Sequence, residues 1–259
     1  LHLVTMFPVA VALSLITRKV FLKVLFAVCA ALFMGAVVAT FSRGGFLGLI
    51  GAGVVLTWKL GRRKRFVSIL LAVVATVMLF GLAPGGYGSR VLSIFGLAPD
   101  SVGSASTRKT LLTHSLYTSL RKPFGIGMGN YHIIALHEGV SHNAYTQVAA
   151  EMGFAALLVY VGFMVVPIRR LRQIERETQD ANQLKRFYYL AIGLQAGLVG
   201  YMISSYFASV AYQWYVYYLV AYAVCLRRLY EAETGRELVL ESQKGKKTNR
   251  PALHPLEHG

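Results

Sequence analysis

The sequence predicts an all-helical membrane protein, folded as a polytopic bundle of transmembrane helices. Three observations lead to this fold class. Hydrophobic residues make up 55% of the 259 residues and charged residues only 15%, whereas about a quarter of the residues in soluble domains are charged. The apolar residues come in blocks of roughly 20, the length that a helix needs to cross a hydrocarbon core. The cations lie in short clusters between these blocks, as topology signals do.

Seven apolar blocks are predicted to be spans of one transmembrane domain over residues 1–226. They are residues 1–16, 20–40, 44–58, 66–83, 145–167, 187–204 and 206–226. Residue 1 is Leu and the first block starts there, so we expect the chain to begin inside a span, with no signal peptide. The last two blocks are compatible either with two short spans joined by a turn near 204–205, or with a long helix and a re-entrant segment.

The distribution of Lys and Arg predicts the orientation of these spans. When the basic cluster at 62–65 is placed in the cytoplasm, all but six of the 27 Lys and Arg residues fall on the cytoplasmic side. The six are Arg43, Arg90, Arg108, Lys109, Arg121 and Lys122. A large polar loop, about residues 84–146, is therefore expected outside the cytoplasm, and residues 227–259 are expected to form a basic, disordered cytoplasmic tail.

The net charge of +16 is explained by this topology. In a soluble protein such a charge would suggest a nucleic-acid partner, but here it serves to orient spans. Membrane lipids are therefore the expected general partner, and nucleic acid is not expected.

The external loop contains one helix signal and one turn signal. A helix is predicted from Ser104 or Ser106 to about Leu120, with Leu112 and Leu116 on the same stripe as Leu120. It is expected to lie along the membrane surface or on top of the bundle. The alternating glycines of 123–129 predict a tight turn, because no strand–turn–helix unit surrounds them as a nucleotide loop requires.

Arginines near predicted helix starts are candidates for binding phosphate. Ser42, Arg43 and Gly44 open the third predicted span, where unpaired N–H groups and the helix dipole favour an anion. Arg108 falls in the first turn of the loop helix, and Arg90 is a weaker candidate from the same loop. The alternatives are that Arg43 extends to lipid headgroups and that Arg108 is an exposed surface residue.

His142 is the candidate catalytic residue. It lies at the start of the fifth predicted span, where the positive end of the helix dipole favours a neutral imidazole that accepts a proton. The alternative is a histidine that caps the helix or contacts headgroups. Asn143, Gln147 and Glu151 share one helix face; they either orient His142, bind a sugar, or join helices by hydrogen bonds. No metal-ligand spacing stands out, so we expect no metal and no cofactor.

These motifs resemble the O-antigen ligase and O-antigen polymerase superfamily. The likeness covers about residues 20–226, and its members usually carry more spans, so it implies that an N-terminal part is missing here. In chain order it rests on Ser42-Arg43-Gly44-Gly45, the loop helix with its arginine, the glycines of 123–129, and His142-Asn143-Ala144-Tyr145 leading to Glu151-Met152-Gly153.

The resemblance implies an α-helical membrane glycosyltransferase of the GT-C type in the bacterial inner membrane. Such an enzyme transfers a glycan from an undecaprenyl pyrophosphate carrier to a hydroxyl of a lipopolysaccharide core, a growing polysaccharide or a protein, on the periplasmic face. By this likeness Arg43 and Arg108 hold the pyrophosphate and His142 activates the acceptor, with inversion and without metal. Ser42, Gly44, Asn143, Tyr145, Gln147 and Glu151 would support them.

A second function class stays open, a flippase or transporter of lipid-linked glycans with no enzymatic activity. Transporters place ionisable groups and broken helices near the middle of the membrane, often in repeated halves. Here most charges lie at the ends of the predicted spans and no internal repeat stands out, which favours chemistry at the outer surface.

Overall fold

The computed structural model of the protein describes residues 1–40, 42–61, 104–135 and 141–235. Within these ranges all regular structure is helical, as the predicted fold class requires. The predicted span at 66–83, the candidate Arg90 and the tail beyond residue 235 lie outside the described residues.

Helices occur at six of the seven predicted positions, together with one helix in the external loop. In chain order they are α1 (His2–Ile16), α2 (Val20–Ala39), α3 (Arg43–Gly61), α6 (Ser104–Arg121), the short η1 (Tyr131–Ile133), α7 (Ala144–Thr178), the short η2 (Asn182–Leu184), α8 (Lys185–Ser205) and α9 (Trp214–Thr234).

Four segments of the described chain are long and apolar enough to cross a membrane. They are Val20–Ala39, Gly44–Gly61, Ala144–Thr178 and Asn182–Ser205. The helix α1 is apolar but shorter than a full span. The protein is therefore a helical membrane protein, while the count of seven spans stays a prediction.

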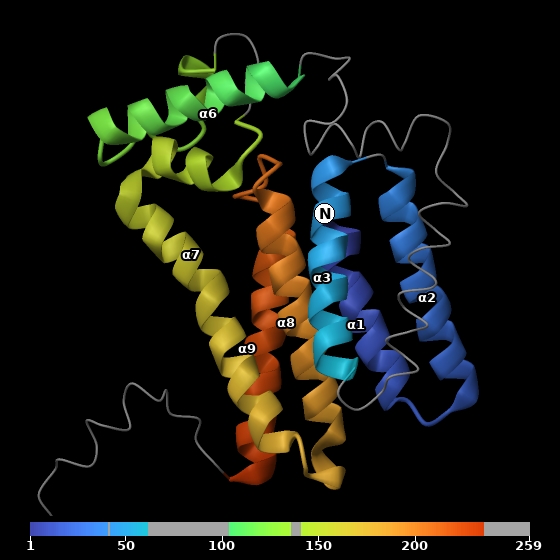
Figure 1. The fold of residues 1–259 in the computed structure, drawn as a ribbon. Coiled ribbons are helices and arrows are strands. Elements are labelled where there is room, and N and C mark those ends of the chain that lie inside the picture. Colours follow the sequence, from blue (N-terminus) through green and yellow to red (C-terminus); the bar gives the residue numbers. More distant parts are fainter. Residues whose placement is uncertain (41, 62–103, 136–140, 236–259) are drawn as a thin grey trace, which may run out of the picture.

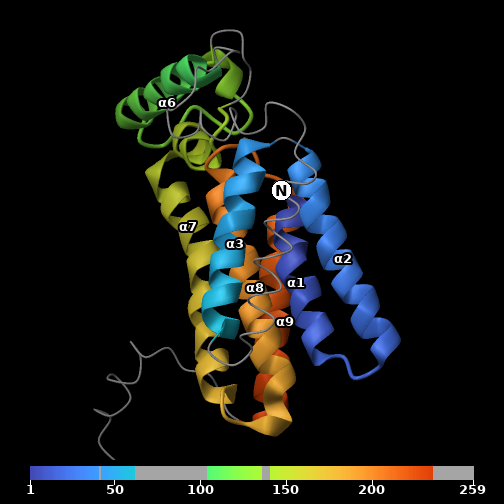
Figure 2. The ribbon, with the colours of Figure 1, turned by 45° about the vertical axis from the view of Figure 1, so that its right-hand side comes forward.

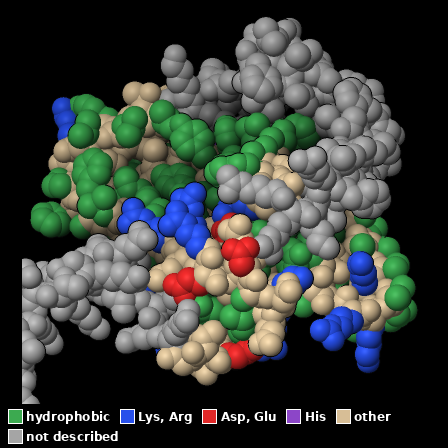
Figure 3. All heavy atoms as spheres, turned by 60° about the horizontal axis from the view of Figure 1, so that its bottom comes forward, with side chains coloured by type: hydrophobic (Ala, Val, Ile, Leu, Met, Phe, Trp, Pro, Cys, Tyr) green, Lys and Arg blue, Asp and Glu red, His purple; other side chains and the backbone are tan. Residues whose placement is uncertain are grey.

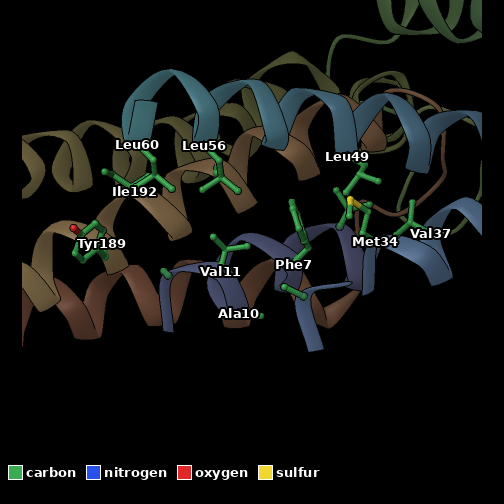
Figure 4. Close-up of a cluster of buried hydrophobic side chains, with 14 of the residues drawn as sticks. Phe7, Ala10, Val11, Met34, Val37, Leu49, Leu56, Leu60, Tyr189 and Ile192 are labelled. Atoms are coloured by element: carbon green, nitrogen blue, oxygen red, sulfur yellow. The ribbon is translucent and has the colours of Figure 1, made fainter. Parts of the chain in front are cut away.

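The long helix α8 lies at the centre of the bundle, packed against α1, α3, α7 and α9 (Figures 1 and 2). Its side chains join two large apolar clusters. One of them fills the space between α1, α2, α3 and α8, where Phe7, Leu56 and Ile192 are almost fully buried (Figure 4). A closely packed interior has low compressibility. The helices are therefore held at fixed positions relative to one another, and so are their ends.

The final predicted span begins eight residues too early. The helix α8 ends at Ser205, and the chain then makes tight turns in which Tyr206 N and Phe207 N donate to the carbonyls three residues before them. The helix α9 begins only at Trp214. The arrangement is two helices with a turn after 204–205. We call residues 206–213 the α8–α9 loop.

The helix α9 also runs beyond the predicted start of the tail. It ends at Thr234, where Gly235 adopts the left-handed conformation (φ 63°) that commonly closes a helix.

The loop helix α6 lies across one end of the bundle (Figures 1 and 2). Its leucine stripe, however, faces outward: Leu116 is 47% and Leu120 73% exposed. The buried face carries Leu111, Ser115 and Ser119 instead. Each serine hydroxyl donates to the carbonyl four residues earlier at 2.7 Å, so it is satisfied within the helix and small enough to allow close packing.

Candidate active site

His142 lies in a constrained segment just before α7. Its φ of 54° is in the left-handed region, which is uncommon for residues other than glycine. Two serines hold this conformation. The backbone N–H of His142 donates to Ser209 Oγ at 2.7 Å, and Ser141 Oγ lies 3.2 Å from the same Ser209 oxygen. A residue in this conformation costs roughly 1–3 kcal/mol and persists only where the surrounding structure enforces it. Such residues cluster at functional sites.

The next residue, Asn143, fixes the start of α7. Its buried side-chain oxygen accepts from Tyr145 N at 2.9 Å and from Thr146 N at 3.1 Å, which satisfies two N–H groups of the first turn. The Tyr145 hydroxyl donates to Met202 O at 2.8 Å and so ties this turn to the end of α8. Asn143 and Tyr145 therefore hold His142 in place from the α7 side.

The start of α3 reaches the same end of the bundle. Ser42 Oγ accepts from Gly45 N at 3.2 Å and caps the helix whose first residue is Arg43. A Cβ on Gly44 would lie 2.7 Å from Phe207 Cβ, so only glycine permits this approach. The start of α3 thus packs against the α8–α9 loop.

The α8–α9 loop therefore joins the two sequence motifs. Its residue Phe207 contacts the start of α3 at Gly44, and its residue Ser209 binds the backbone of His142. The motifs around Arg43 and His142 are about a hundred positions apart in the chain, and the loop brings both to one end of the bundle (Figure 1).

The helix α7 is broken at Gly153. That residue has φ 86° and ψ 175°, so the segment predicted as a span at 145–167 is kinked here, although Ala144–Thr178 as a whole is long and apolar enough to cross a membrane. Figure 1 shows the first turns of α7 running crosswise beneath α6 before the helix turns along the bundle. A Cβ on Gly153 would lie 2.1 Å from Pro123 O, so the break is where the glycine loop of 123–129 enters.

Hydrogen bonds from the glycine loop replace those that the broken helix loses. In an unbroken helix Ala150 O and Glu151 O would accept from residues 154 and 155. Here they accept from Ile126 N at 3.0 Å and Gly127 N at 2.9 Å, while Phe154 N donates to Pro123 O at 3.3 Å. The loop is a tight turn as predicted, with positive φ at its three central glycines.

The Glu151 side chain, 1% exposed, connects this break to the α8–α9 loop. Its carboxylate accepts from Tyr131 N at 3.0 Å and from the Tyr212 hydroxyl. Burial, and then the hydrogen bond to Glu151, raise the pKa of Tyr212, so this phenol stays protonated and donates. The sequence left three roles open for Glu151: orienting His142, binding a sugar, or joining helices by hydrogen bonds. Its observed contacts are of the third kind, because they join separate segments of the chain.

Removing this link is expected to destabilise the protein. Glu151→Ala leaves Tyr131 N and the Tyr212 hydroxyl without their acceptor, at a cost of about 1–3 kcal/mol for each buried group left unsatisfied. Tyr212→Phe removes one donor and should cost less. Thermal unfolding of Glu151→Ala, Tyr212→Phe and the double variant measures the coupling. Strictly additive effects would show that the two side chains do not interact.

Two further predicted residues lie at this end. Gln147 Oε1 is buried and has no hydrogen-bond partner in the described part of the chain. Arg108 is on α6, at a position seven residues before Ser115 and so on the same helix face. The site thus gathers α3, α6, α7 and the α8–α9 loop, while Arg90 lies outside the described residues.

An apolar cavity of about 480 Å³ is lined by residues of the glycine loop, α7, the α8–α9 loop and α9. Two of its lining residues, Ala211 and Tyr212, belong to the α8–α9 loop. The others are Met128, Val148, Met152, Ala156, Val159, Tyr160, Phe163 and Tyr217. Val159, 72% exposed, lies on the apolar outer surface of α7, so the cavity adjoins the lipid-facing side of the helix.

Sequence reasoning missed Ser209, which binds His142. A lone serine in a polar turn carries no motif, and its partner is 67 residues away. A weak signal was present, because several residues after Ser204 are small or polar, as is common in turns. Our prediction placed residues 206–213 in the last span instead.

Comparison with known proteins identifies a family for most of this region. A family model described as O-antigen ligase matches residues 26–161, just over half of the chain. The matched region includes Ser42 to Gly45, α6, the glycine loop and His142 to Gly153. Searches of curated proteins and of solved structures find no match. Because this match covers more than half of the chain, the chain belongs to the O-antigen ligase family.

Proposed function

We propose that this protein transfers a glycan from an undecaprenyl pyrophosphate carrier to an acceptor hydroxyl at the periplasmic face of the bacterial inner membrane. Family membership supports a reaction of the membrane glycosyltransferase type. The candidate acceptors are a lipopolysaccharide core, a growing polysaccharide and a protein.

One observation carries the proposal. The α8–α9 loop contacts three features that this reaction needs at one place. Ser209 holds the backbone of His142, Phe207 packs on the start of α3 beside Arg43, and Tyr212 lines the apolar cavity. A proton acceptor, a helix start that favours an anion and a space for a lipid chain thus surround one loop.

In the proposed mechanism Arg43 and Arg108 bind the pyrophosphate, and the lipid chain enters the apolar cavity. The acceptor oxygen attacks the anomeric carbon from the side opposite the pyrophosphate, so the configuration inverts. The bond from that carbon to the phosphate oxygen breaks, and the lipid pyrophosphate leaves with the bonding electrons. His142 takes the proton of the acceptor hydroxyl. The arginines stabilise the negative charge that grows on the leaving group.

Loss of either arginine is expected to weaken donor binding. Charge-assisted hydrogen bonds contribute about 1.5–3 kcal/mol each, so Arg43→Ala and Arg108→Ala should raise the Kd for the lipid pyrophosphate about 10- to 100-fold. Binding of undecaprenyl pyrophosphate to the purified protein measures this. Arg121→Ala is the matched control, because Arg121 is exposed at the far end of α6 and stacks on Tyr117.

Equal losses in Arg43→Ala, Arg108→Ala and Arg121→Ala would contradict a specific pyrophosphate site. Donor that binds and crosses the bilayer, with no transfer to any of the three acceptor classes, would favour the flippase alternative instead.

A further inference from the structure

A second cavity lies at the end of the bundle remote from α6, between α3, α7 and α8. Its volume is about 300 Å³. The residues that line it are Trp58, Lys59, Arg172, Glu175, Arg176, Gln179 and Tyr188. Figure 3, turned so that this end comes forward, shows Lys, Arg, Asp and Glu side chains spread over the face. None of these lining residues belongs to the proposed transfer site.

The lining of this cavity is predominantly cationic. Three of its side chains are basic and one is acidic. That one carboxylate, on Glu175, is already engaged, since it accepts from Lys59 Nζ and from Gln195 Nε2, the latter at 2.9 Å. The Lys59–Glu175 pair is nearly buried, with side chains 12% and 14% exposed, so it forms a fixed wall of the cavity.

Two arginines are the other basic residues of the lining. Arg172 and Arg176 are four residues apart on α7 and therefore lie on one face of the helix. Guanidinium groups bind phosphate with two parallel hydrogen bonds. The pair is thus suited to a phosphate group.

The cavity also lies at the depth of lipid headgroups. Trp58 and Lys59 stand at the end of the apolar segment Gly44–Gly61, and Trp58 is 60% exposed. Tryptophan and basic residues are typical of the boundary between hydrocarbon and water. Basic pockets between helices at this level bind the headgroups of anionic lipids.

We propose that this cavity binds the phosphate of an anionic phospholipid from the membrane leaflet at this end. The phosphate lies between Arg172 and Arg176, its glycerol backbone lies beside Trp58, and its acyl chains extend along the apolar surface of α3. The site is independent of glycan transfer, and its absence would leave the proposed function intact.

The test is native mass spectrometry of the full chain titrated with phosphatidylglycerol, with phosphatidylcholine as the zwitterionic comparison. The double substitution Arg172→Gln, Arg176→Gln should weaken binding of phosphatidylglycerol about 30-fold, the factor expected when two cations near a membrane surface each contribute about 1 kcal/mol. The matched control is Arg169→Gln, Arg228→Gln, which removes the same charge from two exposed arginines outside the cavity.

The proposal predicts that the control variant binds phosphatidylglycerol as the unmodified protein does, and that phosphatidylcholine binds at least tenfold more weakly, a margin of about 1.4 kcal/mol. Equal weakening in both double variants would mean diffuse surface charge and would overturn the site. Displacement of the lipid by inorganic phosphate at equal concentration would overturn the lipid assignment and indicate a site for free phosphate. Circular dichroism confirms that each variant keeps its helical content.

Discussion

His142→Ala is expected to reduce glycan transfer by about 10²- to 10⁴-fold while leaving donor binding nearly unchanged, because positioned general bases contribute factors of this size. In the proposed mechanism the imidazole acts only on the acceptor proton, so its removal affects the chemical step and not the pyrophosphate contacts. Transfer rates and donor Kd values in membrane vesicles separate the two effects.

The backbone of His142 makes a second variant necessary. Alanine at φ 54° is strained, so a loss of activity in His142→Ala combines lost chemistry with altered backbone. Asparagine tolerates the left-handed region, and His142→Asn therefore keeps the segment while removing the base. His132→Ala, at an exposed histidine on η1, is the control and should transfer normally. Normal transfer by His142→Asn would show that another group takes the proton.

Gly153→Ala is expected to have the largest effect on stability. The residue has φ 86°, and the new Cβ would lie 2.1 Å from Pro123 O, a backbone atom that cannot turn aside as the end of a flexible side chain can. Backbone strain at positive φ costs roughly 1–3 kcal/mol before the clash is added, so we expect a loss of at least about 3 kcal/mol. Thermal unfolding in detergent, followed by circular dichroism, measures it.

Gly162→Ala is the matched control for this prediction. Gly162 lies on the same helix, and a Cβ there would have no atom within 4 Å. Alanine is a better helix former than glycine by about 1 kcal/mol, so this variant should be as stable as the unmodified protein or more so. If Gly153→Ala unfolds at the same temperature as Gly162→Ala, the break in α7 does not depend on the glycine loop.

Local features of the fold could be predicted from the sequence, because they depend on neighbouring residues. Blocks of apolar residues predicted the helices of the bundle, and the predicted end of the loop helix near Leu120 lies one residue from the observed end of α6 at Arg121. The resemblance also identified the segments that the family model matches. These signals act over a few turns of helix or fewer.

Features that depend on distant contacts could not be predicted in the same way. The break at Gly153 is stabilised by hydrogen bonds from residues 123–127, which no periodicity reveals. The leucine stripe of α6 does not reveal which face of the helix is buried, because the buried Ser115 satisfies its hydroxyl within the helix and at Tyr131. The link from Ser209 to His142 likewise exists only in the folded chain.

The most direct test of the central claim is the stoichiometry of a single reaction. The protein in membrane vesicles is given undecaprenyl pyrophosphate carrying a labelled glycan, with each acceptor class in turn and with a metal chelator present. We expect labelled glycan to appear on one acceptor with inverted anomeric configuration, and one undecaprenyl pyrophosphate to be released for each glycan transferred. Donor that stays intact with every acceptor, or transfer that stops when metal is removed, would contradict it.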